Sequence, residues 1–271
     1  MTIASYLLSS DFRRSNDDEQ RGVLWRLNQR SILIALLAFI TIGLNMGFGI
    51  RTAGDVGLNV QNGAKLVIWA SLLLWGIIEW KSVVPLLLQP AGYLLSFLGL
   101  YAAFSAVWSP VPLYTAASAL GWISYVVLAC LAIQYVELNA ILITIFRSLF
   151  AFIAISFALA FVMPDSVWMP PSDVESTFRF MGLTDHPNNF GHSAGLYLVF
   201  TIACLSRRMI SIEPALLHAA FGSIALGLSG DRTMMIALIA ITFLIAVRYT
   251  AIARRLAFGA ALFLAIAFLF F

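Results

Sequence analysis

Long runs of mainly apolar residues recur along the whole chain, and they restrict its fold more than any other feature. A membrane-spanning helix needs roughly 20 such residues, with about 17 at the lower end of the range. Nine runs approach or exceed this length: residues 31–50, 66–80, 86–107, 115–136, 139–163, 190–206, 213–229, 233–249 and 256–271. The second and sixth runs are short, so we expect each to extend by a turn into its flanking loop.

The composition points to the same environment. Of the 271 residues, 61% are hydrophobic and 11% are charged, and the mean hydropathy is +0.93. A soluble domain carries roughly 25% charged residues, so no water-soluble shape could hide this much apolar surface. We therefore expect an all-α polytopic membrane protein with about nine transmembrane helices and the lipid bilayer as its surroundings. The net charge of +3 is small, and we expect no nucleic-acid partner.

Lysine and arginine residues set the expected orientation, because cytoplasmic loops carry an excess of them. With the N-terminus inside, only four of the 16 basic residues fall on the outer side: Arg51, Lys65, Arg179 and Arg232. Residues 1–30 lack the apolar core and cleavage site of a signal peptide, so we expect a cytoplasmic N-terminal tail. Residues 31–271 are then a transmembrane helical bundle with a longer outer loop at 164–190 and a periplasmic C-terminus.

The sequence RFMGLTDHPNNFGH, residues 179–192, is unusually polar for this chain and coincides with the start of the sixth run. Pro187 suits the first turn of a helix, where its missing N–H costs nothing. Three neighbouring residues are good capping residues, because their side chains accept hydrogen bonds from unpaired backbone N–H groups: Asp185, Asn188 and Asn189. This segment is therefore expected to begin a helix at the outer face.

Two further properties of this helix start matter for function. Gly191 and Gly195 have the G-x-x-x-G spacing that lets another helix approach closely. The N-terminal end of a helix carries unpaired N–H groups and a partial positive charge, which favour an anion such as phosphate. The simpler interpretation is that these residues only cap and pack a helix.

Two arginines are candidates for binding such an anion. Arg179 precedes the helix start by a few residues, and a guanidinium group can bond two phosphate oxygens at once. In LSGDRTMM, residues 228–235, Gly230 is expected to end the seventh span in a left-handed conformation and Asp231 to cap the eighth. Arg232 then lies in the first turn of that helix, the unfavourable end of the dipole for a cation.

A pyrophosphate clamp made by Arg179 and Arg232 is thus one hypothesis. The alternatives are lipid headgroups or an ion pair with Asp173 or Glu175 for Arg179, and an ion pair with Asp231 or Asp185 for Arg232.

The histidines and cysteines give weaker signals. His186 precedes a proline and is expected to be extended, whereas His192 could hydrogen-bond a neighbouring helix. His218 lies inside the seventh run, where a polar contact is expected. The three histidines lack the spacing of a metal site, and Cys130 and Cys204 are expected to be buried thiols. We therefore expect neither a metal nor another cofactor.

Three segments together resemble the O-antigen ligase and polysaccharide polymerase superfamily, which includes Wzy-like proteins of exopolysaccharide production. They are RFMGLTDHPNNFG at 179–191, LSGDRT at 228–233 and FSAVWSPVP at 104–112. The last is similar to the family's Trp-Ser motif at the outer end of the third span. The segments occur in the family's order and on one predicted side of the membrane.

The resemblance implies a protein of the bacterial inner (cytoplasmic) membrane with a role in lipopolysaccharide or exopolysaccharide biosynthesis. Members transfer or polymerise glycans carried on undecaprenyl pyrophosphate at the periplasmic face, using a lipid or glycan acceptor. They are metal-independent inverting transferases. By their place in the motifs, Arg179 and Arg232 match the family's pyrophosphate-binding arginines, and Asp185, His186, Asn188, Asn189, His192 and Asp231 are expected to support them.

One departure from the family bears on activity. The family typically continues beyond the ninth span with a large periplasmic loop that carries its catalytic histidine. Neither His186 nor His192 matches that histidine, so the catalytic residue stays unassigned and the chain is expected to be a truncated member. A small-solute transporter and a non-catalytic component of a polysaccharide assembly complex remain alternatives, although the predicted spans are nearly free of charged residues.

Overall fold

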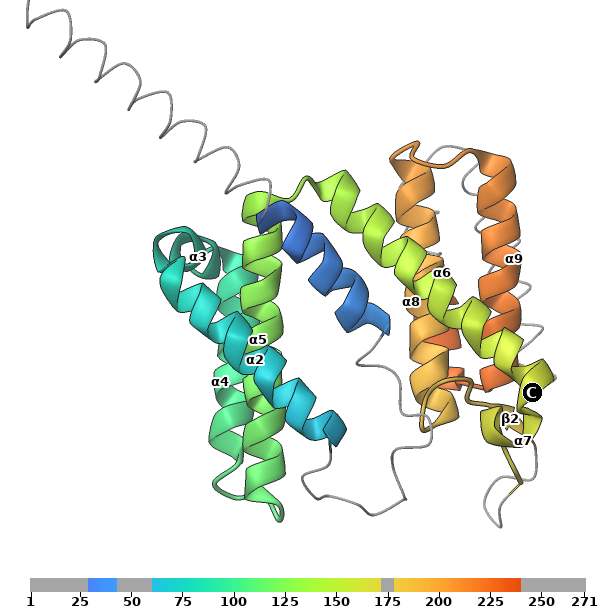
Figure 1. The fold of residues 1–271 in the computed structure, drawn as a ribbon, viewed down its shortest axis with the longest axis horizontal. Helices are drawn as coiled ribbons and strands as arrows, with labels where there is room; N and C mark the ends of the chain where they lie inside the picture. Colours follow the sequence, from blue (N-terminus) through green and yellow to red (C-terminus); the bar gives the residue numbers. More distant parts are fainter. Residues whose placement is uncertain (1–28, 43–59, 172–177, 240–271) are drawn as a thin grey trace, which may run out of the picture. The chain divides into compact units, whose positions relative to one another are not determined.

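The computed structural model describes residues 29–42, 60–171 and 178–239, which are mainly helical (Figure 1). The chain divides into two compact units, each described here by itself. Unit 1 comprises Met1–Leu37 and Val56–Ile141, and unit 2 comprises Ala38–Asp55 and Leu142–Phe271.

Unit 1 contains most of the helix Gln29–Ile42. It also contains α2 (Val60–Ile78), α3 (Trp80–Leu87), α4 (Pro90–Ser105) and α5 (Pro112–Tyr135), which follow one another along the chain. The axes of α2 and α3 meet at an angle of 97°, with Glu79 at the break. The Tyr135 hydroxyl of α5 donates a hydrogen bond to the Glu79 carboxylate at 2.7 Å, which ties the break to α5. Because we expected a loop between the second and third spans, α3 is a feature that the sequence interpretation missed.

Unit 2 contains the end of the helix Gln29–Ile42, most of α6 and the segments that follow α6. Its elements are α6 (Leu138–Val162), α7 (Pro164–Val167), β1 (Trp168–Met169), β2 (Arg179–Phe180), α8 (Pro187–Ser206) and α9 (Ile212–Ser229), followed by helical residues 232–239. β1 and β2 pair antiparallel, with Trp168 opposite Phe180 and Met169 opposite Arg179. The predicted outer loop 164–190 therefore contains a short helix and a small strand pair, and its residues 172–177 lie outside the described part.

An aromatic core positions β2 and the start of α8. Phe180 and Phe190 are fully buried, and their ring centroids lie 4.9 Å apart in an edge-to-face arrangement. Phe157 of α6 stacks on Phe180 at 5.3 Å. Because successive side chains of a strand point to opposite faces, burial of Phe180 directs the preceding side chain, Arg179, away from this core.

Several described helices are suited to a membrane. Within the described residues, α5, α6 and α9 are long and apolar enough to span a bilayer, and the bent pair of α2 and α3 would make a fourth candidate. Many large apolar side chains on these helices are exposed, for example Leu113, Phe161 and Leu217. A helical membrane protein is therefore supported.

The finer topology predictions are confirmed only in part. The sixth run was predicted to extend by a turn, and α8 indeed begins at Pro187 rather than at residue 190. The third run is represented by α4, which has 16 residues and is shorter than a typical span. The ninth predicted span, most of the eighth and nearly all of the predicted tail lie outside the described residues. The count of nine spans and the orientation of the termini stay predictions.

Both cysteines fit their expected role. Cys130 in α5 and Cys204 in α8 are buried and free, as the sequence predicted.

Candidate functional site

The turn after α9 brings together several of the predicted polar residues of unit 2. Gly230 ends α9 in a left-handed conformation with φ +63°, and its N–H donates to the Gly227 carbonyl at 3.1 Å. The next helix is capped by Asp231, whose Oδ1 accepts a hydrogen bond from the Met234 N–H at 3.1 Å. The predicted roles of Gly230 and Asp231 are both confirmed.

The start of α8 differs in one detail from the prediction. Pro187 occupies the first helical position as expected, but the capping side chain is that of His186. This residue is extended, as predicted before a proline, and its Nδ1 accepts from the Asn188 N–H at 3.1 Å. The predicted caps Asp185 and Asn189 instead bond to each other, with Asn189 Nδ2 donating to Asp185 Oδ1 at 2.8 Å.

The G-x-x-x-G spacing has the predicted effect. Gly191 and Gly195 allow α8 to lie against the turn and the first residues of the next helix. A Cβ atom added at Gly191 would lie 2.4 Å from the Asp231 Cβ, and one at Gly195 would lie 2.2 Å from the Met234 Cγ. Real Cβ atoms essentially never come so close, so a side chain at either glycine would require the neighbouring Asp231 or Met234 to shift.

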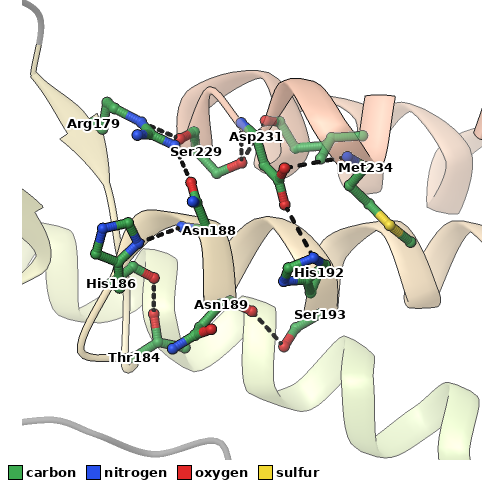
Figure 2. A network of polar contacts seen from close by, with 11 residues as sticks. Arg179, Thr184, His186, Asn188, Asn189, His192, Ser193, Ser229, Asp231 and Met234 are labelled. Carbon is green, nitrogen blue, oxygen red and sulfur yellow. Dashed lines mark hydrogen bonds and ion pairs between the residues drawn. The ribbon is translucent and has the colours of Figure 1, made fainter. Parts of the chain in front are cut away.

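Arg179 joins β2 to both neighbouring helices (Figure 2). Its Nε donates to the Ser229 carbonyl oxygen at 2.8 Å, and its Nη2 donates to Asn188 Oδ1. The guanidinium group is therefore fixed against the turn that carries Arg232, which is exposed in the first turn of the helix 232–239. The alternative partners Asp173 and Glu175 lie outside the described residues.

The Asp231 carboxylate also faces α8. The residue is only 3% exposed, and its Oδ2 lies 3.8 Å from Nε2 of His192, whose side chain is 54% exposed (Figure 2). No donor among the described residues forms a hydrogen bond with this oxygen. The expected hydrogen bond from His192 to a neighbouring helix is not formed, and the ring lies instead at an ion-pair distance from that helix's capping residue.

Some contacts could not be found from the sequence. Arg179 is fixed by the carbonyl of Ser229. Because this carbonyl is a backbone group, no residue type in the sequence could indicate the contact. Thr184 is buried, and its hydroxyl donates within the loop before α8, to the carbonyls of Met181 and His186, at 2.6 and 2.8 Å. A threonine three residues before a proline is a weak signal, and we did not assign it a role.

The site has the electrostatic character of an anion-binding surface. The N-terminal ends of α8 and of the helix 232–239 meet where Gly191 touches Asp231, and each contributes partial positive charge. Arg179 and Arg232 add two full charges. Two carboxylates of the described residues lie at these helix starts: that of Asp231 is buried and serves as a cap, and that of Asp185 is exposed and accepts from Asn189.

The third motif, FSAVWSPVP, lies in unit 1 between α4 and α5. The hydroxyl groups of Ser109 and Thr115 are 2.6 Å apart there, and the Val111 N–H donates to Ser109 Oγ at 3.1 Å. These contacts shape the turn into α5. Because the motif belongs to the other unit, it is not placed relative to Arg179.

The chemistry open to this site follows from its side chains. Across the described ranges, no group of three or more His, Cys, Asp or Glu side chains could hold a metal ion. Two arginines, two helix N-termini and a half-exposed histidine instead suit a phosphorylated ligand. No family model, curated protein or solved structure matches this chain.

Proposed function

We propose that the chain binds the pyrophosphate of a lipid-linked glycan at the outer face of the membrane. The observation that carries the proposal is the position of Arg179, which is fixed by Ser229 and Asn188 beside the turn that carries Arg232. Arginine is always charged, and its fork matches phosphate oxygens. Two such side chains beside two helix N-termini supply both the charge and the donors that a pyrophosphate needs.

The surroundings of Arg232 favour a ligand attached to a lipid. Ile236 lies four residues after Arg232 on the same helical face, and its side chain is 56% exposed. Elsewhere in unit 2, two other apolar side chains are exposed as well, those of Leu196 in α8 and Ile224 in α9. A charged group at the helix start followed by apolar side chains matches a molecule with a pyrophosphate head and a hydrocarbon tail.

The resemblance stated from the sequence extends this proposal to a reaction. The chain would belong to metal-independent inverting glycan transferases of the O-antigen ligase or polysaccharide polymerase type. Such a protein works in the bacterial inner membrane and transfers a glycan from undecaprenyl pyrophosphate to a lipid or glycan acceptor. Arg179 and Arg232 would hold the pyrophosphate while it leaves.

Binding of farnesyl pyrophosphate to the purified full chain in lipid nanodiscs tests the clamp. We expect the wild-type chain to bind it, and Arg179→Ala and Arg232→Ala each to weaken binding by about tenfold or more, because a hydrogen bond to a charged group contributes about 1.5–3 kcal/mol. Arg207→Ala removes an exposed arginine at the other end of α8 and should change the affinity less than about twofold. Equal affinity in all four proteins would refute the clamp.

A cellular assay separates transfer from the alternatives. In cells that encode the chain, its deletion should cause lipid-linked glycan to accumulate and the glycan product to be lost. Re-expression of Arg232→Ala should fail to reverse either change, whereas Arg207→Ala should reverse both. If glycan products stay normal after deletion while uptake of a small solute is lost, a transporter is the correct interpretation.

A further inference from the structure

We propose that His192 is the general base of the transfer reaction and that Asp231 is the residue that positions its ring. This inference rests on the proposed function, because a general base needs a hydroxyl acceptor to act on. It starts from one contact, the 3.8 Å distance between His192 Nε2 and Asp231 Oδ2 (Figure 2).

The two oxygens of Asp231 have different surroundings. Oδ1 accepts the hydrogen bond that caps the helix 232–239, whereas Oδ2 has no hydrogen-bond partner among the described residues. A buried carboxylate oxygen without a donor is costly. Nε2 of the half-exposed His192 ring lies 3.8 Å from this oxygen, at an ion-pair distance, and we assign the ring proton to this nitrogen. With its proton held at Nε2, the ring presents an unprotonated Nδ1.

The surrounding backbone is built to allow this pairing. A Cβ atom at Gly191 would lie 2.8 Å from Asp231 Oδ2 and 2.7 Å from Ser229 Oγ. Only a glycine immediately before His192 therefore lets the carboxylate lie directly on α8. Buried Asp231 is held from a second side as well, because its own N–H donates to Ser229 Oγ at 3.3 Å.

The His192–Asp231 pair is held by residues that also hold the two arginines of the clamp. Asn188, which accepts from Arg179, lies one helical turn before His192 on α8. Arg232 directly follows Asp231, and Ser229 contacts both Arg179 and Asp231. The histidine and the leaving-group site thus depend on the same turn, residues 229–232, and on the same face of α8.

The proposed transfer step forms one bond and breaks one bond at the anomeric carbon of the glycan. The acceptor hydroxyl gives its proton to His192 Nδ1 while its oxygen forms a bond to the anomeric carbon of the glycan. The bond from that carbon to the pyrophosphate oxygen breaks, and its electron pair leaves with the lipid pyrophosphate, whose charge Arg179 and Arg232 neutralise. The protonated His192, stabilised by Asp231, then releases its proton to water.

Membrane vesicles from cells that lack the gene, in which native lipid-linked glycan accumulates, provide the substrate for the test. Purified full-length chain is added, and the consumption of lipid-linked glycan is followed by chromatography. We expect His192→Ala to lower the rate by about 100-fold or more, a typical loss for a general base. Affinity for farnesyl pyrophosphate should stay within about twofold of wild type, and added imidazole should restore part of the rate.

Asp231→Asn tests the positioning residue, because an asparagine oxygen can still accept from the Met234 N–H and keep the helix cap. We expect a rate loss of about tenfold or more with an unchanged KM. Leu217→Ala is the control, since this side chain is exposed on α9, has no part in the proposed site and should leave the rate unchanged.

The possible outcomes separate this inference from the proposed function. If the wild-type chain consumes no lipid-linked glycan, the proposed transfer fails and this inference fails with it. If the wild-type chain is active and His192→Ala keeps its rate, only the assignment of His192 is overturned. Loss of rate together with loss of farnesyl pyrophosphate affinity, without rescue by imidazole, would show a structural role and overturn the assignment too. A fully active Asp231→Asn would overturn the positioning role.

Discussion

The two ends of the α8–α9 pair each carry two arginines, yet their settings differ (Figure 1). At the end where α8 runs into α9, Arg207 is the C-terminal cap of α8 and Arg208 follows it, both exposed. At the opposite end, Arg179 is held by Ser229 and Asn188, and Arg232 lies in the first turn of a new helix.

Helix dipoles explain the arginines at the first end, but at the second end they explain only Arg179. Arg207 meets the partial negative charge of a helix C-terminus, and Glu213 in the first turn of α9 meets a partial positive one. Both placements are favourable by about 0.3–1 kcal/mol. At the second end, Arg179 donates to the Ser229 carbonyl at the C-terminus of α9, which is also favourable, whereas Arg232 lies in the first turn of a helix, where a cation is unfavourable. The position of Arg232, rather than the number of charges, therefore distinguishes this end.

The largest expected effect concerns the packing that brings the two helix N-termini together. Gly191→Val places a branched side chain where even a Cβ atom lies 2.4 Å from the Asp231 Cβ. We expect the free energy of unfolding in detergent, followed by circular dichroism, to fall by about 3 kcal/mol, the upper part of the usual range for overpacking.

Gly227 offers a matched control in the neighbouring helix. A Cβ atom added there meets nothing within 4 Å, so Gly227→Ala should be neutral or should stabilise the chain by about 0.5–1 kcal/mol. Equal stability of Gly191→Val and wild type would mean that α8 does not lie against the turn 229–232.

The packing at Gly191 also shows how much of the structure could be predicted from the sequence. The G-x-x-x-G spacing, Pro187 in a first turn, Gly230 in the left-handed region and the cap at Asp231 were all predicted, because each follows from the local preferences of one residue type. The long apolar helices α5, α6 and α9 followed equally well from their composition.

Other features depend on contacts between distant segments, which a local pattern does not contain. Arg179 was identified as a cation near a helix start, but one of its partners is a backbone carbonyl 50 residues away. His186 took the capping role predicted for Asp185 or an asparagine because its ring nitrogen reaches the Asn188 N–H. The helix α3 was missed because its eight residues are too few to show a periodic pattern beside a long apolar run.

A medium effect is expected for the arginine that holds the site together. Arg179→Ala removes donors from the Ser229 carbonyl and from Asn188, and we expect the free energy of unfolding to fall by about 2 kcal/mol. Arg207→Ala at the other end should cost less than about 1 kcal/mol, since interactions of an exposed charge at a helix C-terminus are weakened by water. Chemical denaturation of both variants in the same detergent gives the comparison, and equal losses would remove the structural distinction between the two ends.

The smallest effect should have the opposite sign. Arg208 adopts φ 56°, a left-handed conformation that costs a side-chain-bearing residue about 1–2 kcal/mol and costs glycine almost nothing. Arg208→Gly should therefore stabilise the chain by about 1 kcal/mol in a thermal unfolding experiment, whereas Arg208→Ala, which removes the charge but keeps the strain, should not. Affinity for farnesyl pyrophosphate should be the same in both variants as in wild type. A loss of affinity in both would show that the second pair of arginines also serves an anion, and the contrast between the two ends of α8 and α9 would then no longer mark the site.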